Sequence, residues 1–241
     1  MTYTFGRKMK HIGFNYKQIF IVGLVMLLSA CGSTPQPTVA LNTNALTNKE
    51  LKIGIVYTAP EDKATTHIFG AGCLLCYGVA SALTSSLDSH LESTIDTSEL
   101  DNLKALVLSE YSQRSSNVEF VSLPVPMKKL KKFKGELGFA KKDFRSLKEI
   151  LTLDIIVVFE VSRYGAYRSF SNYIPNGDPQ GHIAGSLYAI DLNTNAFVQY
   201  MNIDEKVQPS GEWDEAPTFP SVTTSYYQAV ENFKQKIRDA I

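Results

Sequence analysis

Two of the chain's three cysteines, Cys73 and Cys76, lie in the stretch FGAGCLLCYG, separated by two leucines. This C-x-x-C spacing is that of redox dithiols, and two such pairs form many zinc sites. A structural zinc ion needs four ligands, and the sequence holds no second C-x-x-C and no H-x-x-x-H, which argues against zinc. A reactive dithiol needs a stabilised thiolate, yet no basic residue is near in sequence, and His67 and His90 are the nearest titratable partners.

The position of the motif also bears on its chemistry. In redox proteins of the thioredoxin type, the motif follows directly after a strand, at the start of a helix. Here the preceding predicted strand ends at Thr58, well before Cys73. In an oxidising compartment the two cysteines are expected to pair as a local disulfide that makes a turn rigid. Redox activity therefore stays the minority interpretation of this motif.

The segment around the cysteines allows two further interpretations. From 64 to 87 it contains no Asp, Glu, Lys or Arg, although the chain is 20% charged. One interpretation is a glycine-rich turn that enters a buried helix, with both cysteines as small core residues. The other is an exposed apolar contact surface against a bilayer, a partner or another copy of the chain. Small residues would permit close approach there, and the candidates are Gly70, Gly72, Gly78 and Ala82.

A basic segment, MKKLKKFKGELGFAKKDFRSLK (127–148), holds nine basic and two acidic residues. Leu130, Phe133 and Leu137 recur within it at helical spacing. A basic stretch with an apolar stripe is typical of segments that lie on an anionic membrane surface. A solvated helix face or loop, or a contact with an acidic glycan, an acidic protein or a second copy, are the alternatives. The lysines of this candidate surface are Lys128, Lys129, Lys131, Lys132 and Lys134.

The N-terminus has the pattern of an export signal. Residues 1–18 include four basic and no acidic residues, and an apolar run of about ten residues follows, spanning roughly 15 Å or half a hydrocarbon core. That length predicts a cleaved signal rather than a membrane span. The sequence Leu28-Ser29-Ala30-Cys31 resembles the lipobox of bacterial lipoproteins. The resemblance implies cleavage before Cys31 and a covalent diacylglycerol and N-acyl lipid on it, with no other cofactor.

These features predict the organisation of the chain: a lipoprotein signal peptide (1–30), a lipidated cysteine with a flexible tether (31–50) and one periplasmic domain (51–241). The tether is polar and contains two prolines. In Gram-negative lipoproteins an aspartate after the cysteine favours inner-membrane retention, so Gly32 implies the outer-membrane class. The expected location is the periplasmic face of the outer membrane, which excludes nucleic acid as a partner.

The order of the predicted elements indicates an α+β fold. Strands are expected at 51–58, 117–125 and 153–165, with a hairpin at 181–208 that turns at 193–195, and helices at 79–95, 98–115, 143–151 and 221–241. In the first helix, Val79, Leu83, Leu87 and Leu91 are expected to face the core. This order predicts a single domain with a mixed sheet of about five strands covered by helices.

The same order, with LTLDIIVVFEV leading into GSLYAIDLNTNAFVQY, resembles two envelope families. They are the amino-terminal domain of the TolB translocation protein and the periplasmic domain of the curli-secretion lipoproteins. The turn YAIDLNTN (188–195) carries part of the likeness, which covers 51–60 and 98–241 and departs at 64–97. Because of that departure the assembly functions of these families are not carried over. The predicted lipid anchor places the domain beside a bilayer, so we expect a non-enzymatic factor in envelope assembly, secretion or maintenance that acts through contacts with an envelope protein or with its own copies.

Motifs for catalysis are missing from the sequence. There is no G-x-S-x-G, no Walker A loop, no G-x-G-x-x-G in a strand–turn–helix context and no H-E-x-x-H. Asn176, Asp178 and His182 are expected in a turn-rich loop, and Asp178 alone does not make a metal site. The sequence therefore predicts a protein that is not an enzyme. The alternatives are a tethered dithiol protein and a glycan- or lipid-binding module.

Overall fold

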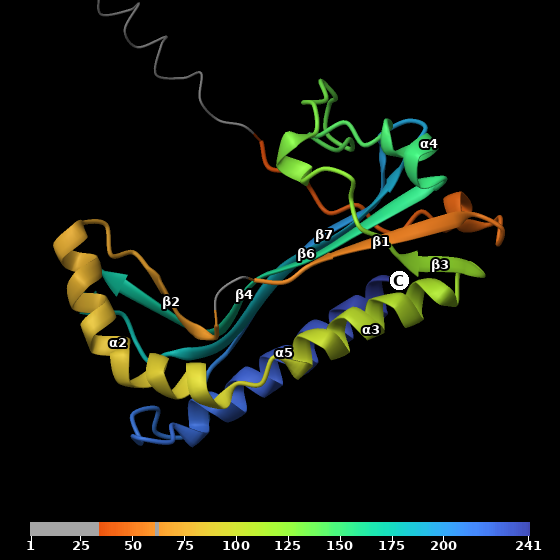
Figure 1. Cartoon of the computed structure of the whole chain (residues 1–241). Helices are drawn as coiled ribbons and strands as arrows, with labels where there is room; N and C mark the ends of the chain where they lie inside the picture. The colour runs from red at the N-terminus through yellow and green to blue at the C-terminus, as the bar shows by residue number, and fades with distance from the viewer. Residues whose placement is uncertain (1–33, 61–62) are drawn as a thin grey trace, which may run out of the picture. The chain divides into compact units, whose positions relative to one another are not determined.

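A computed structural model describes residues 34–60 and 63–241 (Figure 1). The chain separates into a unit that ends at Gln36 and a compact unit from Pro37 to Ile241. Every described helix and strand belongs to the second unit. The predicted signal peptide and the predicted lipidation site Cys31 lie outside the described residues.

The second unit is built on a mixed sheet of seven strands. Its main path runs in the order β3 (Asn117–Phe120), β1 (Lys52–Thr58), β4 (Ile155–Ser171), β6 (Gln180–Asp191) and β7 (Phe197–Val207). Two short strands, β2 (Thr65–Phe69) and β5 (Ile174–Pro175), also pair with β4. β1 is parallel to β3 and β4, and β4, β6 and β7 are antiparallel. The predicted α+β class is confirmed, with more strands than the five expected.

The central strand β4 serves two parallel neighbours in succession. Its first half pairs with β1 and its second half pairs with β2, and a bulge between Val161 and Arg163 separates the two registers. Its start, IIVVF, is buried on both faces because helices cover one side and loops the other. Gly165 lies opposite Thr65 with φ +118°, and a Cβ there would come within 2.5 Å of the Thr65 carbonyl oxygen.

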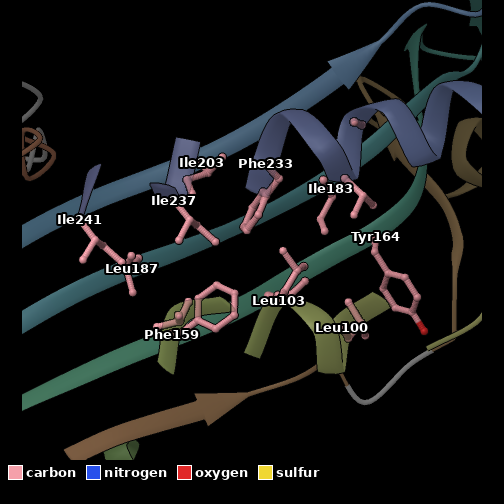
Figure 2. Packing of buried hydrophobic residues seen from close by; sticks show 14 of the residues in the cluster. Leu100, Leu103, Phe159, Tyr164, Ile183, Leu187, Ile203, Phe233, Ile237 and Ile241 are labelled. Atoms are coloured by element: carbon pink, nitrogen blue, oxygen red, sulfur yellow. The ribbon is translucent and has the colours of Figure 1, made fainter. Parts of the chain in front are cut away.

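One face of the sheet carries the larger core, formed with three helices: α2 (Leu74–Thr94), α3 (Ser98–Ser112) and α5 (Pro220–Ala240). Figure 2 shows Ile237 of α5 beside Ile203 of β7, and Ile241 at the chain end beside Leu187 of β6. The predicted stripe on this helix is fully buried: Val222, Tyr226, Val230, Phe233 and Ile237. Its helical spacing is confirmed, and its burial ties the C-terminus to the sheet.

The other face is covered at one end by the basic segment, where η2 (Met127–Lys129) and α4 (Leu147–Leu151) lie. The predicted helical stripe of Leu130, Phe133 and Leu137 is wrong, because residues 130–146 are irregular and Leu137 is 54% exposed. Buried Asn195, in the left-handed region at φ 67°, holds this segment instead. Its side chain donates to the carbonyls of Ala140 and Lys142 and accepts from the backbone N–H of Phe144.

Residues 37–50 are packed on the domain, which corrects the predicted extent of the flexible tether. Val39 exchanges two backbone hydrogen bonds of 2.8 and 2.9 Å with Tyr200 on the outer edge of β7. The 3₁₀ helix η1 (Thr43–Leu46) follows and buries Leu46 in the larger core. The compact unit therefore begins at Pro37 rather than at residue 51.

Across residues 34–60 and 63–241, no helix has both the length and the apolar character that a membrane span needs.

Candidate contact surfaces

The segment with the two cysteines forms an arm, defined here as β2 and α2 with the turn that joins them (65–94). β2 lies on the second half of β4, and a tight turn follows it. Gly70 has φ +81°, and a Cβ there would lie 2.1 Å from the carbonyl oxygen of Phe170. Glycine at this position is therefore required for the close approach of the turn to β4.

Cys73 and Cys76 form a disulfide at the start of α2. Cys73 is the N-cap residue, and its Sγ accepts a hydrogen bond of 3.0 Å from the backbone N–H of Cys76. A short turn joins β2 to the cysteines, which open α2. The prediction that the strand preceding Cys73 ends at Thr58 is therefore wrong, because β2 lies between them. The strand was missed because its five residues, TTHIF, belong to the uncharged stretch 64–87 and lead directly into the glycine-rich turn.

α2 packs on β2 through a stripe that differs from the predicted one. Its buried residues are Cys76, Ala80, Thr84, Leu87 and Leu91, whereas Val79 and Leu83 are 45% and 49% exposed. The carboxylate of Asp88 explains this rotation, because it accepts hydrogen bonds from the Thr66 backbone N–H (2.6 Å) and the Thr84 hydroxyl (3.0 Å). The helix is therefore fixed to β2 by a partly buried polar contact as well as by packing.

The outward side of α2 is apolar in its first half and polar in its second. Leu75 is 83% exposed, and Gly78, Val79 and Ala82 are also exposed. At 100° per residue these four positions lie on one face, here called the α2 face. The same side continues in the second half with exposed serines: Ser85, Ser86, Ser89 and Ser93.

The four small residues proposed from the sequence do not form one surface, because two lie on the α2 face and two lie in the turn before the helix. A Cβ at Gly78 would meet nothing within 4 Å, and Ala82 is exposed. Gly72 is exposed beside Asn172, whereas Gly70 serves the turn. Internal packing does not account for a glycine at 78, where alanine would favour the helix by about 1 kcal/mol. Leu74, which is 90% exposed, extends the apolar area at the end of the helix.

A cleft of about 650 Å³ lies between β2, α2 and β4. Its titratable side chains include His67, Asp88 and Arg163. The Nε2 atom of His67 lies 3.1 Å from the carbonyl oxygen of Tyr164, and Asp88 is engaged with β2 and Thr84. Within the described part of the chain, no group of three His, Cys, Asp or Glu side chains is placed to hold a metal ion.

The basic segment presents its lysines outward. Those at 128, 129, 131, 132, 134 and 141 are exposed, and in the described ranges none of them forms an ion pair. Lys142 differs, because its ammonium group donates to the carbonyls of Lys128 and Leu130 and so holds the segment together. All five lysines proposed from the sequence are thus exposed on this segment, which packs on a different core cluster from α2.

The predicted position of His182 in a turn-rich loop is wrong, because the residue lies within β6 and is fully buried. In the neutral ring Nε2 donates to the Asp204 carboxylate over 2.7 Å, and Nδ1 has no hydrogen-bond partner among the described residues. Burial lowers the pKa of His182 to about 4 and outweighs the nearby carboxylate. No pattern in the sequence signals this contact, because it depends on the β6–β7 register.

This histidine predicts acid sensitivity. The pKa of His182 is near 6.5 in the unfolded chain and about 4 in the folded one, so the unfolded chain binds its proton first. The stability that neutral His182 contributes is fully present above about pH 6.5 and is lost as the pH falls toward 4. Between pH 7.5 and 5.0 the loss is on the order of 2 kcal/mol, measured by urea unfolding. His182→Gln should remove most of this dependence of the unfolding free energy on pH. A smaller dependence should remain from His90, because burial also lowers the pKa of that side chain. An unchanged slope in the variant would contradict the assignment.

Comparison of the chain with known proteins finds no matching family model and no matching curated protein. Among solved structures, protein XCC0632 of family DUF330 from Xanthomonas campestris is 11% identical, with 86% of each chain covered and a TM-score of 0.36. The dodecamer of the PelC L103M variant from Paraburkholderia phytofirmans is 10% identical, covering 82% of this chain and 94% of that one, with a TM-score of 0.29. Lipoprotein GNA1162 from Neisseria meningitidis is 11% identical, covering 75% and 99%, with a TM-score of 0.29. Scores of this size do not establish a shared fold.

Proposed function

We propose that this chain is an outer-membrane lipoprotein, anchored through Cys31, whose periplasmic domain acts without catalysis in assembly, secretion or maintenance of the envelope. The observation that carries the proposal is the α2 face. It is an exposed apolar helix surface on an arm that the rest of the domain does not cover. Exposed apolar surface is costly in water, and in proteins it usually marks a contact with another molecule.

The pattern of side chains along α2 supports a contact role. The helix changes from Leu75, Gly78, Val79 and Ala82 to a run of serines on the same side. Solubility alone would favour serines over the whole length. The Gly78 and Ala82 pair leaves a shallow strip on which the backbone of another helix can approach closely. These features fit a protein partner that packs on the first half of α2.

A larger side chain at position 78 tests the proposal, because it fills the shallow strip on the α2 face. Gly78→Leu places a side chain where nothing lies within 4 Å and removes a helix-breaking glycine, so the isolated protein should stay folded and melt no lower. Its complexes should be lost in a pull-down of the native lipoprotein with mild detergent. Ser89→Leu, on the serine half of the same side, is the matched control and should keep them. Wild-type complexes from Gly78→Leu would overturn the proposal.

A tethered dithiol protein is the second candidate, and one observation favours it. The cysteines open α2 directly after β2, and the N-terminus of a helix stabilises a thiolate. Reduction of the disulfide takes two electrons and two protons and yields two thiols, with a partner dithiol as the reductant. The double variant Cys73→Ser, Cys76→Ser decides between the candidates. Retained complexes and phenotype would remove the dithiol role, whereas trapped mixed disulfides in single-cysteine variants would support it.

A further inference from the structure

We infer that the lysine surface of the basic segment, defined as Lys128, Lys129, Lys131, Lys132 and Lys134, rests on the anionic phospholipid surface of the membrane that holds the N-terminus. The inference deepens the proposed function and rests on it for the anchor at Cys31. It assigns a membrane contact to the basic segment and leaves the α2 face free for protein.

The first support is where the compact unit begins. Residues 39–42 pair with the start of β7, through Val39 with Tyr200 and Asn42 with Val198. The basic segment pairs with the same stretch of chain, because the backbone N–H of Phe197 donates to the carbonyl of Gly138 over 2.8 Å. In Figure 1 the start of the compact unit, in orange, and the loops between β3 and α4 lie on the same side of the sheet.

Side chains also join the two regions. The hydroxyl of Tyr188 contacts the sulfur of Met127, which begins the lysine-rich turn. The Tyr188 ring packs against Tyr200, the partner of Val39, with 6.0 Å between ring centroids. Phe197 completes this aromatic group at 4.9 Å from Tyr200. The lysine surface therefore cannot move independently of the point at which the chain enters the domain.

The second support is the length of chain between the anchor and the domain. From Cys31 to Pro37 there are six residue steps, which reach about 20 Å when extended. Because residues 37–50 are packed, this short link is all that separates a lipid at Cys31 from the domain. The surface beside Pro37 is thereby kept close to the lipid headgroups.

The third support is charge. Residues 127–142 contain seven lysines and a single carboxylate, Glu136. The five lysines of the surface are exposed and, among the described residues, lack ion-pair partners. Leu137, 54% exposed in the same segment, offers an apolar side chain to the interface. Lysine clusters next to a lipid anchor are attracted by anionic headgroups, and an acyl chain with a basic patch forms a stable two-part anchor.

The experiment reconstitutes the mature full-length lipoprotein on vesicles of phosphatidylcholine alone or with about 30% phosphatidylglycerol, a proportion that gives a negative surface potential. A water-soluble amine reagent labels the lysines, and mass spectrometry reads each site. We expect labelling of Lys128–Lys134 to fall about threefold or more on the anionic vesicles and to recover in 0.5 M salt, as screening requires. Lys49 and Lys52, exposed elsewhere, should label equally on both.

Variants make the assignment specific. The triple variant Lys129→Gln, Lys131→Gln, Lys132→Gln should abolish the protection of Lys128 and Lys134. The matched triple at Lys49, Lys52 and Lys63, with the same charge change, should retain it. Equal labelling on both vesicle types, or protection that depends on protein concentration without vesicles, would overturn the inference. Flotation with neutral vesicles reports the lipid at Cys31 separately, so loss of the anchor is distinguishable from loss of the lysine contact.

Discussion

Phe233→Ala should lower the free energy of unfolding by about 4 kcal/mol. The side chain is fully buried in the middle of α5, at 6.3 Å between ring centroids from Phe159 of β4. It also lies against the backbone of β6, because a Cβ at Gly185 would come within 3.2 Å of its ring. Truncation leaves a cavity between helix and sheet that the rigid strands cannot fill, so the transfer and cavity costs add.

Urea unfolding followed by circular dichroism measures this loss. Tyr227→Ala on the same helix is the control, because Tyr227 is 37% exposed and its truncation should cost less than about 1 kcal/mol. Equal losses in the two variants would mean that α5 is not packed as described. A large loss confined to Phe233→Ala would place the main core between α5 and the sheet.

Gly165→Ala should release the arm from the sheet. Gly165 combines φ +118° with a close approach to the backbone of Thr65, at 2.5 Å from its oxygen and 2.7 Å from its nitrogen. A methyl group there meets backbone atoms, which cannot rotate away, so β2 must separate from β4. We expect a loss of at least about 3 kcal/mol in the part of the molecule that includes the arm.

Hydrogen exchange by mass spectrometry locates this effect. In Gly165→Ala, residues 65–94 should exchange faster, whereas 197–207 in β7 should remain protected. Gly177→Ala is the control for backbone strain alone, since Gly177 has φ +140° and a Cβ there meets nothing within 4 Å. Its cost should be about 1 to 2 kcal/mol without a change in the arm. Uniform loss of protection across the sheet in Gly165→Ala would contradict an arm held mainly at this position.

Elements with a strong and uninterrupted pattern were predictable from the sequence. The apolar run of β4, the hairpin of β6 and β7, and the stripe on α5 all signal burial by their own residues, and all three are present. The hairpin turn was placed at 193–195, and Asn195 indeed adopts φ 67° there. These patterns indicate the α+β class, because the stripe on α5 has the period of a helix and the β-branched residues of the β4 run favour a strand.

The arm and the basic segment could not be predicted, because their patterns mislead. β2 has only five residues and lies in the same uncharged stretch as the first half of the helix that follows, so the two were read together. The orientation of α2 depends on Asp88, a polar contact that hydrophobic spacing ignores. In the basic segment, apolar residues at helical spacing are accompanied by the helix-breaking residues Gly135 and Gly138, and the anchoring Asn195 lies far away in sequence. Both errors concern the candidate contact surfaces, where local pattern and tertiary contacts disagree.

The edges of the sheet limit how copies of this chain can join. β3 at one end of the main path has only four residues, and at the other end the start of β7 is already occupied by Val39. β2, which among the described strands pairs only with β4, has five residues, and its Thr66 N–H already donates to Asp88. The remainder of β7 points Asn202, Asp204 and Lys206 outward. Short, capped and charged edges discourage strand addition and the fibrous aggregates it produces. Any stable association between copies is therefore expected to bury helix surface instead of extending the sheet.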